Sequence, residues 1–337
     1  MLRVAAYTSG RNVSSARFRV RQYIPGLRDL GVEVRERWAR LDNFPPENKA
    51  LRPLWAIAAI CERALSATGS LLSDITLLQR EMLSTMVTAE PLTKGPRALD
   101  VDDAIWLYRG GSSARRLARL CDLVICGNGF LGENFKRWNP HIHILPTAVD
   151  TDRYRPADPL PISARRLIGW CGSASTLRYL APLAPVFKVI LERHRDVKLR
   201  VVADKPPALD GIPDDRLEFI PWSPEGEVGA IQEMSIGLMP LEDTLWTRGK
   251  CSFKLLTYMA CGVPAVASPV GMNVEVLAAG GGLAARGCDE WIDSIDLLLN
   301  SESAARRLRR QGREAVERDY SLRTLTPRLA RILRSCS

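Results

Sequence analysis

The stretch with the clearest chemical character is a basic loop directly before a predicted helix. Arg248, Gly249 and Lys250 precede Ser252, a residue type that favours helix N-termini. The helical spacing of apolar residues ends at Gly262, a typical position just beyond a helix. Helix amides, the positive end of the helix dipole and two cations together favour an anion such as phosphate. The alternative is that both cations are solvated loop charges.

A second glycine turn follows another predicted strand. Gly172 and Ser173 come after the apolar run 167–171, and Arg178 adds a cation in the next helical turn. This arrangement predicts a second anion-binding turn, although the GxGxxG and Walker patterns are absent. Ligands of open α/β sheets bind at the carboxyl ends of strands, so we expect both turns to serve one ligand.

Composition indicates a globular protein of two domains. The chain has 337 residues, 46% hydrophobic and 25% charged. It contains no run of 18 uninterrupted apolar residues, so we predict no membrane span. Eight cysteines without CxxC spacing are typical of reduced thiols in a cytosolic protein.

Positive charge is concentrated in the first half of the chain. Of the formal net charge of +9, residues 1–157 carry +7 and residues 158–337 carry +2. A basic first half fits an anionic membrane surface or a phosphorylated acceptor; the alternative is solubility alone. No nucleic-acid motif is present, so no nucleic acid is expected as a partner. Residues 54–72 predict a long helix with Glu62 and Arg63 on its solvent side; packing of its apolar residues on the sheet is favoured over a membrane.

Strand and helix patterns alternate along the whole chain. This order predicts an α/β fold with two parallel sheets. The predicted strands are residues 2–7, 32–37, 75–78, 97–101, 123–126 and 143–145, then 167–171, 198–202, 217–220, 236–239 and 265–267. A proline-containing linker at 150–165 predicts a first domain over 1–157 and a second over 158–319. A helix at about 320–337 is expected to pack back on the first domain.

Several motifs together resemble glycosyltransferase family 4. They are the runs 168–173, 254–264 and 267–271, with Asn128 and the run 146–150 as further matches. The resemblance covers most of the chain and is most specific in the helix-strand block at 254–264. It implies the GT-B architecture, in which two Rossmann-like domains face each other across a cleft.

The resemblance also implies an activity. A retaining transferase of hexosyl type moves a sugar from a nucleotide sugar in the second domain. The acceptor, on the first domain, is a glycan, a lipid-linked molecule or a small molecule, as in polysaccharide or glycoconjugate biosynthesis. No metal and no cofactor are implied, because cations and helix N-termini hold the diphosphate. The implied location is cytoplasmic, with peripheral contact at the inner face of a membrane as an option.

Residue roles follow from the matched positions. Lys250 and Arg178 would stabilise charge on the departing nucleotide, and Asp102 would face the sugar or the acceptor. The predicted donor-binding residues are Gly172, Ser173, Arg248, Gly249, Cys251, Ser252, Phe253, Thr257 and Trp222. For Trp222, a half-buried position at a sheet edge is the favoured alternative.

Two departures from the family pattern concern acidic residues. Gly249 and Thr257 stand where relatives carry two glutamates. The resulting hypothesis is that Glu242 or Asp243, from the preceding loop, takes the place of one of these glutamates. The pair Asp102-Asp103 stands where many relatives have His-Asp, and helix capping is the alternative role for Asp103.

The predicted acceptor or cleft residues lie in the first domain. They are Ser9, Gly10, Arg11, Arg17, Arg21, Asp103 and Asn128. Arg17 and Arg21 are spaced to share a helix face, where like charges are unfavourable unless a counter-charge is present. An anionic acceptor would supply that charge, and an Asp or Glu from elsewhere would serve as well.

Two further readings compete with an active transferase. The missing glutamates suggest a binding protein of transferase-like fold with weakened or lost activity. The strand-turn-helix pattern alone suggests an NAD-dependent dehydrogenase. The absent GxGxxG and the absent acidic residue after a second strand count against the dehydrogenase.

Overall fold

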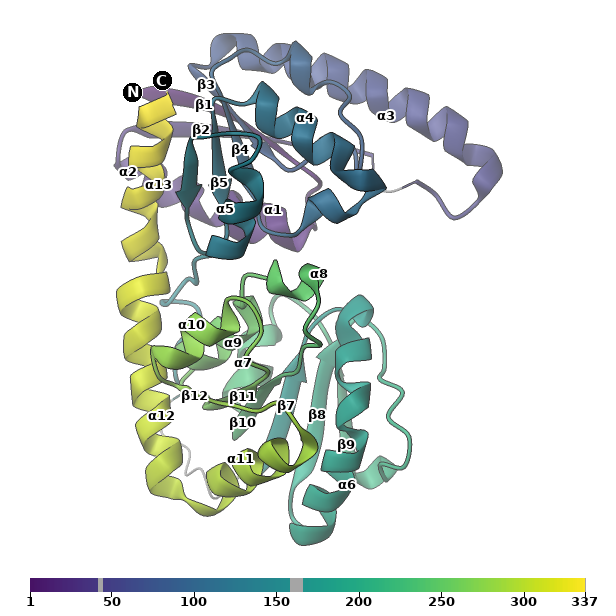
Figure 1. Ribbon diagram of the computed structural model, residues 1–337, viewed down its shortest axis with the longest axis vertical. Coiled ribbons are helices and arrows are strands. Elements are labelled where there is room, and N and C mark those ends of the chain that lie inside the picture. Colours follow the sequence, from purple (N-terminus) through teal and green to yellow (C-terminus); the bar gives the residue numbers. More distant parts are fainter. Residues whose placement is uncertain (42–44, 158–165, 337) are drawn as a thin grey trace. The chain divides into compact units, whose positions relative to one another are not determined.

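A computed structural model describes residues 1–41, 45–157 and 166–336. It divides into two compact units (Figure 1). The first comprises Met1–Ala148, Gly249–Cys251 and Leu322–Ser337; the second comprises Val149–Arg248 and Ser252–Ser321. The domain boundary predicted at 157–158 abuts residues outside the described ranges and stays a prediction.

The first unit is built on a parallel six-stranded sheet. Its order is β2-β1-β3-β4-β5-β6. Successive strands are therefore added on one side of β1 and then on the other, which places the switch point of the strand order between β1 and β3. The strands are β1 (Leu2–Thr8), β2 (Val32–Trp38), β3 (Ile75–Gln79), β4 (Arg97–Val101), β5 (Leu123–Cys126) and β6 (Ile142–Ile144). All six match the predicted strands to within a residue or two.

Helices cover both faces of this sheet. They are α1 (Ser14–Arg19), α2 (Ile24–Asp29), α3 (Arg52–Ala67), α4 (Ser112–Leu120), α5 (Gly129–Phe135) and α13 (Leu322–Cys336). Right-handed crossovers place α3, α4 and α5 on one face and α1 and α2 on the other. Leu325, Leu329 and Leu333 of α13 pack into the same core as Leu27 of α2.

The second unit also has a parallel six-stranded sheet. Its strands are β7 (Leu167–Cys171), β8 (Lys198–Ala203), β9 (Leu217–Pro221), β10 (Ile236–Met239), β11 (Ala265–Ala267) and β12 (Gly282–Ala284). The order β12-β11-β10-β7-β8-β9 is, read from β9, the 3-2-1-4-5-6 order of Rossmann folds. The predicted α/β fold with two parallel sheets is therefore confirmed. Strand β12 was not predicted, because its three residues begin with glycine.

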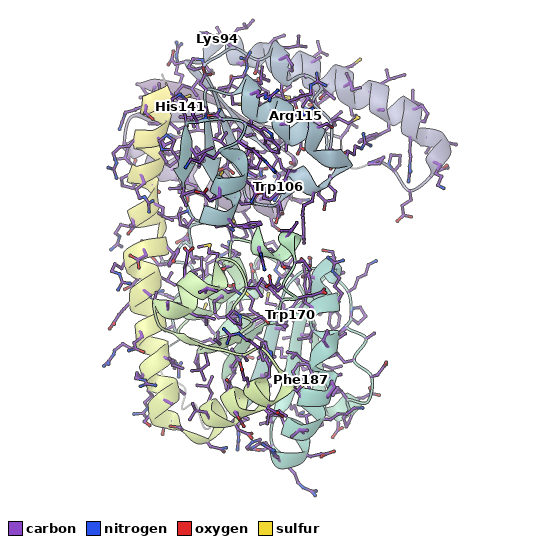
Figure 2. All side chains as sticks on the ribbon, in the orientation of Figure 1. Lys94, Trp106, Arg115, His141, Trp170 and Phe187 are labelled. Carbon is purple, nitrogen blue, oxygen red and sulfur yellow. The ribbon has the colours of Figure 1, made fainter. Side chains whose placement is uncertain are left out.

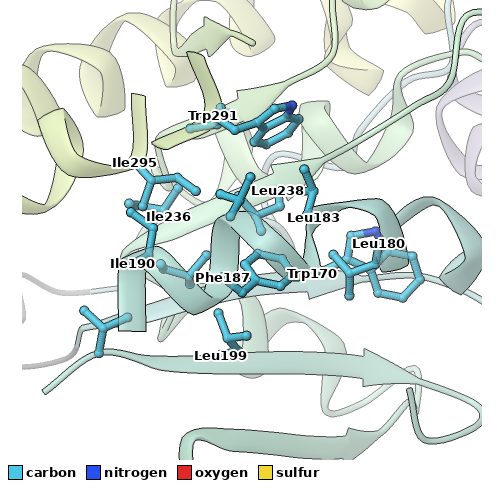
Figure 3. Close-up of a cluster of buried hydrophobic side chains, with 14 of the residues drawn as sticks. Trp170, Leu180, Leu183, Phe187, Ile190, Leu199, Ile236, Leu238, Trp291 and Ile295 are labelled. Carbon is cyan, nitrogen blue, oxygen red and sulfur yellow. The ribbon is translucent and has the colours of Figure 1, made fainter. Parts of the chain in front are cut away.

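The helices of the second unit surround one large apolar core. They are α6 (Ala184–Arg193), α7 (Glu227–Gln232), α8 (Leu245–Arg248), α9 (Phe253–Ala260), α10 (Asn273–Ala278), α11 (Cys288–Asn300) and α12 (Glu302–Ala315). Figure 3 shows Phe187 and Ile190 of α6 meeting strand residues of this core. Among the described residues, the helical stretch Ala174–Arg193 is the one long and apolar enough to cross a membrane. Its buried side chains belong to this core.

Two helical regions differ from what the sequence pattern suggests. Residues 14–29 form α1, a short turn at Arg21–Tyr23 and α2 instead of one continuous helix. For α3 the predicted orientation is wrong: Arg63 is fully buried, and Leu54, Ile57 and Leu65 are exposed. The Arg63 guanidinium donates to the carbonyl oxygens of Arg37 and Thr8, 3.3 and 3.4 Å away. These carbonyl groups lie near the carboxyl ends of β2 and β1. They give the buried guanidinium of Arg63 two backbone acceptors.

Candidate functional site

The two turns singled out in the sequence follow neighbouring strands of the second sheet. The Gly172 turn follows β7, and the loop that includes Arg248 follows β10. β7 and β10 pair in parallel, with Ile236 opposite Ile168. The strand order reverses between these two strands, and such a switch point leaves a crevice where α/β proteins bind ligands. The candidate site of the second unit is therefore at this switch point.

Glycine is required at position 172 by close packing. Its amide donates to the Val202 carbonyl, 2.9 Å away. A Cβ at this position would lie 2.4 Å from Cε of Lys254 and 2.6 Å from the ring of Trp170. Trp170, labelled in Figure 2, is the penultimate residue of β7, the strand that leads into the turn. The turn is thus wrapped tightly around a lysine side chain.

Lys254 is a site residue that sequence reasoning missed. Its Nζ lies 5.0 Å from the centre of the Trp170 ring and 3.4 Å from Oγ1 of Thr176. Lys254 belongs to the first turn of α9, the helix that follows the basic loop. Its side chain therefore connects the start of this helix to the Gly172 turn. Its position could have indicated this role, because Lys254 is the first residue of the family-specific block 254–264. The cations considered from the sequence lie before this helix, whereas Lys254 lies within its first turn.

The chain after Gly172 differs from the predicted α-helix. Residues Ala174–Tyr179 form a tighter 3₁₀ turn, and α6 begins only at Ala184, five residues after that turn ends. The Ala174 amide donates to the carboxylate of Asp204, so this amide already has an acidic acceptor. Ser173 shares a hydrogen bond of 2.9 Å with Ser175. The exposed Arg178 donates to the Tyr179 hydroxyl, 2.9 Å away.

The start of α9 is fixed differently from the prediction. Ser252 holds the N-cap position, but its hydroxyl donates to Oδ1 of Asn273 at 2.7 Å rather than capping a helix amide. Asn273 in turn donates to the Ser268 carbonyl at 2.9 Å. Ser252 also has a φ of 52°, a left-handed conformation that is strained for a serine and is common at functional sites. Phe253 follows as the first residue of the helix.

The two cations of the basic loop each pair with a carboxylate. Nε and Nη2 of Arg248 donate to Asp243 at 2.6 and 2.9 Å. Lys250 Nζ lies 3.2 Å from Oδ1 of Asp103, and both residues belong to the first unit. The sequence did not predict either pair. In this structure Asp243, considered as a substitute for a missing glutamate, is engaged by Arg248.

Asp102 and Asp103 form a charge network in the first unit. Arg80 donates to Oδ1 of Asp102 at 2.5 Å and to Oδ2 of Asp103 at 2.6 Å. Burial opposes ionisation of Asp103, but the charges of Arg80 and Lys250 outweigh it and lower the pKa of Asp103. Arg80 has a φ of 61° directly after β3, beside the switch point of the first sheet. The Asp103 carboxylate therefore pairs with cations rather than capping a helix.

The tripeptide Gly249–Cys251 packs closely within the first unit. A Cβ on Gly249 would lie 2.9 Å from Cβ of Ala104, so a glutamate there would need the backbone to shift. The Cys251 thiol donates to the Asp102 carbonyl at 3.3 Å, and burial raises the pKa of this thiol to about 12. Asn128 donates to the Lys250 carbonyl at 3.0 Å, and its Oδ1 caps α5.

The predicted doubly positive face of Arg17 and Arg21 is relieved from within the chain. Arg21 forms a bidentate ion pair with Glu36, with both N–O distances at 2.8 Å. It also donates to the Arg11 carbonyl at 2.7 Å. Arg17 lies over the Phe18 ring at 4.2 Å. Of the two counter-charges considered, the structure supplies a glutamate for Arg21, so these arginines no longer argue for an anionic acceptor.

The remaining predicted residues divide by burial. Ser9 is buried directly after β1, and Gly10 packs against Val13. Thr257 is buried, and its hydroxyl donates to the Lys254 carbonyl at 2.8 Å. The Trp222 amide donates to the Ala203 carbonyl at 2.9 Å, beyond the end of β9. The proposed roles of these residues toward a ligand stay predictions.

Metal ligands do not gather in the part of the chain that the structure describes. Within those residues, no group of three or more His, Cys, Asp or Glu side chains is arranged to hold an ion. The expectation of a metal-independent reaction stays a prediction.

The segment that contains the switch point of the second sheet matches a known protein family. Residues 165–301 match the family model described as glycosyl transferases group 1. For this segment, the match confirms a resemblance to glycosyltransferases, and the assignment to family 4 stays a prediction. No curated protein sequence matches the chain.

Several solved structures share the fold along nearly the full chain. Sucrose-phosphate synthase from Thermosynechococcus elongatus has a TM-score of 0.73 at 13% identity, covering 99% of both chains. HepE from Anabaena, solved with UDP and glucose, has 0.71 at 12%, covering 99% of this chain and all of the other. A glycosyltransferase from Rickettsia africae has 0.71 at 13%, covering 99% and 98%. The fold of the chain is thus GT-B, as predicted.

Proposed function

We propose that the protein is a retaining glycosyltransferase that uses a nucleotide-sugar donor. The observation that carries this proposal is the switch point of the second sheet. There Lys254 lies against the Gly172 turn that follows β7, and Arg178 is in the 3₁₀ turn directly after it. The family match over residues 165–301 covers all of these residues. HepE, which shares the fold, was solved with UDP-glucose as well as with UDP.

The proposed chemistry needs positive charge around a diphosphate. During transfer, the bond between the anomeric carbon and the diphosphate oxygen breaks, and a bond to the acceptor hydroxyl oxygen forms. The acceptor loses its proton, and the nucleoside diphosphate leaves with an added negative charge. Arg178, Lys254 and Lys250 would stabilise that charge, and Arg248 would add to it. Arg248 and Lys250 would exchange their aspartate partners for phosphate oxygens.

The acceptor would be a glycan, a lipid-linked molecule or a small molecule bound by the first unit. Asp102 would face the sugar or the acceptor, and no metal or cofactor would take part. Polysaccharide or glycoconjugate synthesis in the cytoplasm is the setting that this chemistry fits.

A thermal-shift panel of UDP-, GDP-, dTDP- and ADP-sugars tests the donor. Binding to the folded state raises the melting temperature, so one base should stand out. The selected donor is then incubated with acceptors, and the released nucleoside diphosphate and the anomeric configuration of the product are measured. No shift with any nucleotide sugar would overturn the proposal.

A second function is favoured by the missing carboxylates. Gly249 leaves no room for a glutamate, and the Thr257 hydroxyl is engaged within its own helix. A nucleotide-sugar-binding protein of GT-B fold with weakened or lost activity would have these features. It would show a thermal shift with a donor but neither transfer nor hydrolysis.

A further inference from the structure

A carboxylate follows the second strand of the second sheet. An acidic residue in this position was expected to be absent, but Asp204 directly follows β8. The strand runs one residue past the predicted run 198–202, which brings Asp204 next to its end. The GxGxxG pattern is still absent at Gly172, so this carboxylate does not restore the dehydrogenase interpretation. It does place a negative charge at the sheet edge that carries the candidate site.

The carboxyl ends of β7, β8 and β9 are level with one another. In the parallel pairing of β7 and β8, Cys171 lies opposite Val202. In the pairing of β8 and β9, Ala203 lies opposite Pro221. Figure 1 shows the three strands side by side in this order. The residues that follow them therefore form a row along the edge of the sheet: Gly172, Asp204 and Trp222. Neighbouring strands lie about 5 Å apart, so the row spans about 10 Å.

Asp204 is held against the turn that follows β7. Its Oδ1 accepts a hydrogen bond from the Ala174 amide, in the 3₁₀ turn directly after that strand. Within the part of the chain that the structure describes, Oδ2 of Asp204 has no hydrogen-bond donor, and the residue is exposed. Each carboxylate oxygen can accept more than one hydrogen bond. Asp204 can therefore accept hydroxyl groups of a ligand while it keeps its bond to the turn.

The neighbours of Asp204 narrow the chemistry of that ligand. Lys254 and the Gly172 turn are the part of the site proposed for the diphosphate. A carboxylate next to a diphosphate repels it, so its presence there is favourable only toward a group that donates hydrogen bonds. In a nucleotide the ribose, with two adjacent hydroxyl groups, lies between the diphosphate and the base. The row has the same order, with the half-buried aromatic residue Trp222 at the end where a base would lie.

We propose that Asp204 recognises the ribose hydroxyl groups of the donor and makes the site selective for ribonucleotides. Oδ2 accepts the hydrogen bond of the 2′-hydroxyl group, and the 3′-hydroxyl group donates to the same carboxylate. The carboxylate that Thr257 does not supply comes in this way from the loop after β8. The inference rests on the proposed function and names the donor class: sugars activated by a ribonucleoside diphosphate. Sugars activated by dTDP, whose deoxyribose lacks the 2′-hydroxyl group, bind weakly.

Calorimetric titration with matched nucleotides tests this selectivity. The full chain is titrated with UDP, GDP and ADP and with their 2′-deoxy counterparts. For the base that binds, we expect the ribonucleotide to bind at least about tenfold more tightly, because the lost hydrogen bond has a charged acceptor. Equal affinities for the two forms would overturn this inference and leave the proposed function intact. No binding of any of the six nucleotides would overturn the proposed function, and this inference with it.

The variant Asp204→Asn assigns the selectivity to this side chain. Its amide oxygen can still accept from Ala174, but an NH₂ group that cannot accept a hydrogen bond replaces Oδ2. We expect the preference for the ribonucleotide to be lost. The affinity for the 2′-deoxy form should stay the same or rise, because a negative charge next to the diphosphate is removed. The control is Asp215→Asn, an exposed aspartate before the amino end of β9, which should keep the full preference.

The ratio of the two affinities separates recognition from a structural role. A carboxylate that only shapes the turn would, when replaced, weaken the binding of both forms equally, and that result would overturn the inference. So would a full ribose preference in Asp204→Asn. Thermal denaturation without ligand confirms that both variants are folded.

Discussion

The two sheets have carboxyl ends of contrasting chemistry. In the first unit, charged side chains there are neutralised by one another: Arg19 with Asp100, and Arg80 and Lys250 with Asp103. In the second unit, Arg248 pairs with Asp243 in the same manner, but Lys254 contacts an aromatic ring and a hydroxyl beside a glycine turn. The contrast teaches that similar sheets can surround cations with different partners. The ion pairs stabilise the fold, whereas the role proposed for Lys254 is ligand binding.

Breaking the most buried pair of the first unit should have the largest effect. Arg19 and Asp100 side chains are 1% and 4% exposed and 2.6 Å apart. Arg19→Met leaves Asp100 as an uncompensated buried charge, which should lower the free energy of unfolding by about 3–5 kcal/mol. Urea denaturation measures this loss. The double variant Arg19→Met with Asp100→Asn should recover most of it; no recovery would mean that the pair is not what stabilises this region.

Filling the space at Gly249 should have the next largest effect. Gly249→Ala brings a methyl group against Ala104 and should cost about 1–3 kcal/mol of unfolding free energy. Gly129→Ala is a matched control in the same unit, because a Cβ there meets nothing within 4 Å. Equal stabilities of the two variants would show that Gly249 is not closely packed. A family-like glutamate at 249 could then be restored without penalty.

Removing the lysine at the second switch point should affect the ligand and not the fold. Lys254→Met keeps the aliphatic stem against Trp170 and removes the charge. The donor selected by the thermal-shift panel should bind about tenfold more weakly, about 1.4 kcal/mol, with unfolding free energy nearly unchanged. Calorimetric titration measures the affinity, and Lys205→Met, an exposed lysine after β8, is the control. If Lys254→Met binds the donor as tightly as the original chain, Lys254 does not bind this ligand. The proposed functional difference between the cations of the two sheets would then be lost.

Lowering the pH should have the smallest effect of the four changes. It should weaken the ion pairs of Asp103 with Arg80 and Lys250 in the first unit. The pKa of Asp103 in the folded chain lies below its ordinary value of 3.8. Its ionised form therefore stabilises the fold above about pH 4, and this contribution is lost as pH falls through the lowered pKa. The difference in unfolding free energy between the original chain and Asp103→Asn should shrink on acidification. A constant difference would show that Asp103 is not ion-paired in solution.

Most strands could be predicted because they are short segments dominated by buried apolar residues. Residues 97–101, 123–126, 167–171, 236–239 and 265–267 have the same bounds in prediction and structure. Parallel strands covered on both faces leave little ambiguity in such runs. Strand β12 lacks that signal, and its pairing with β11 depends on a distant part of the chain.

Both turns could be predicted as loops that follow strands, but their ion pairs could not. Glycine and serine after β7, and basic residues after β10, indicated these loops before the strand order was known. The partner of Lys250 was not visible, because Asp103 is far away in sequence. Asp243 is only five residues from Arg248, but their pairing depends on the shape of the loop between them. Arg63 was misplaced for a related reason. Arginine is rarely buried, and only the tertiary arrangement reveals the carbonyl groups that it satisfies.

The buried Arg63 has a consequence for how α3 presents its leucines. Turning the helix about its own axis to bury them would break the hydrogen bonds from the guanidinium to the Thr8 and Arg37 carbonyl oxygens. Arg63 therefore fixes the rotation of α3 about its own axis. The same contact that buries this charge keeps Leu54, Ile57 and Leu65 on the exposed side of the helix.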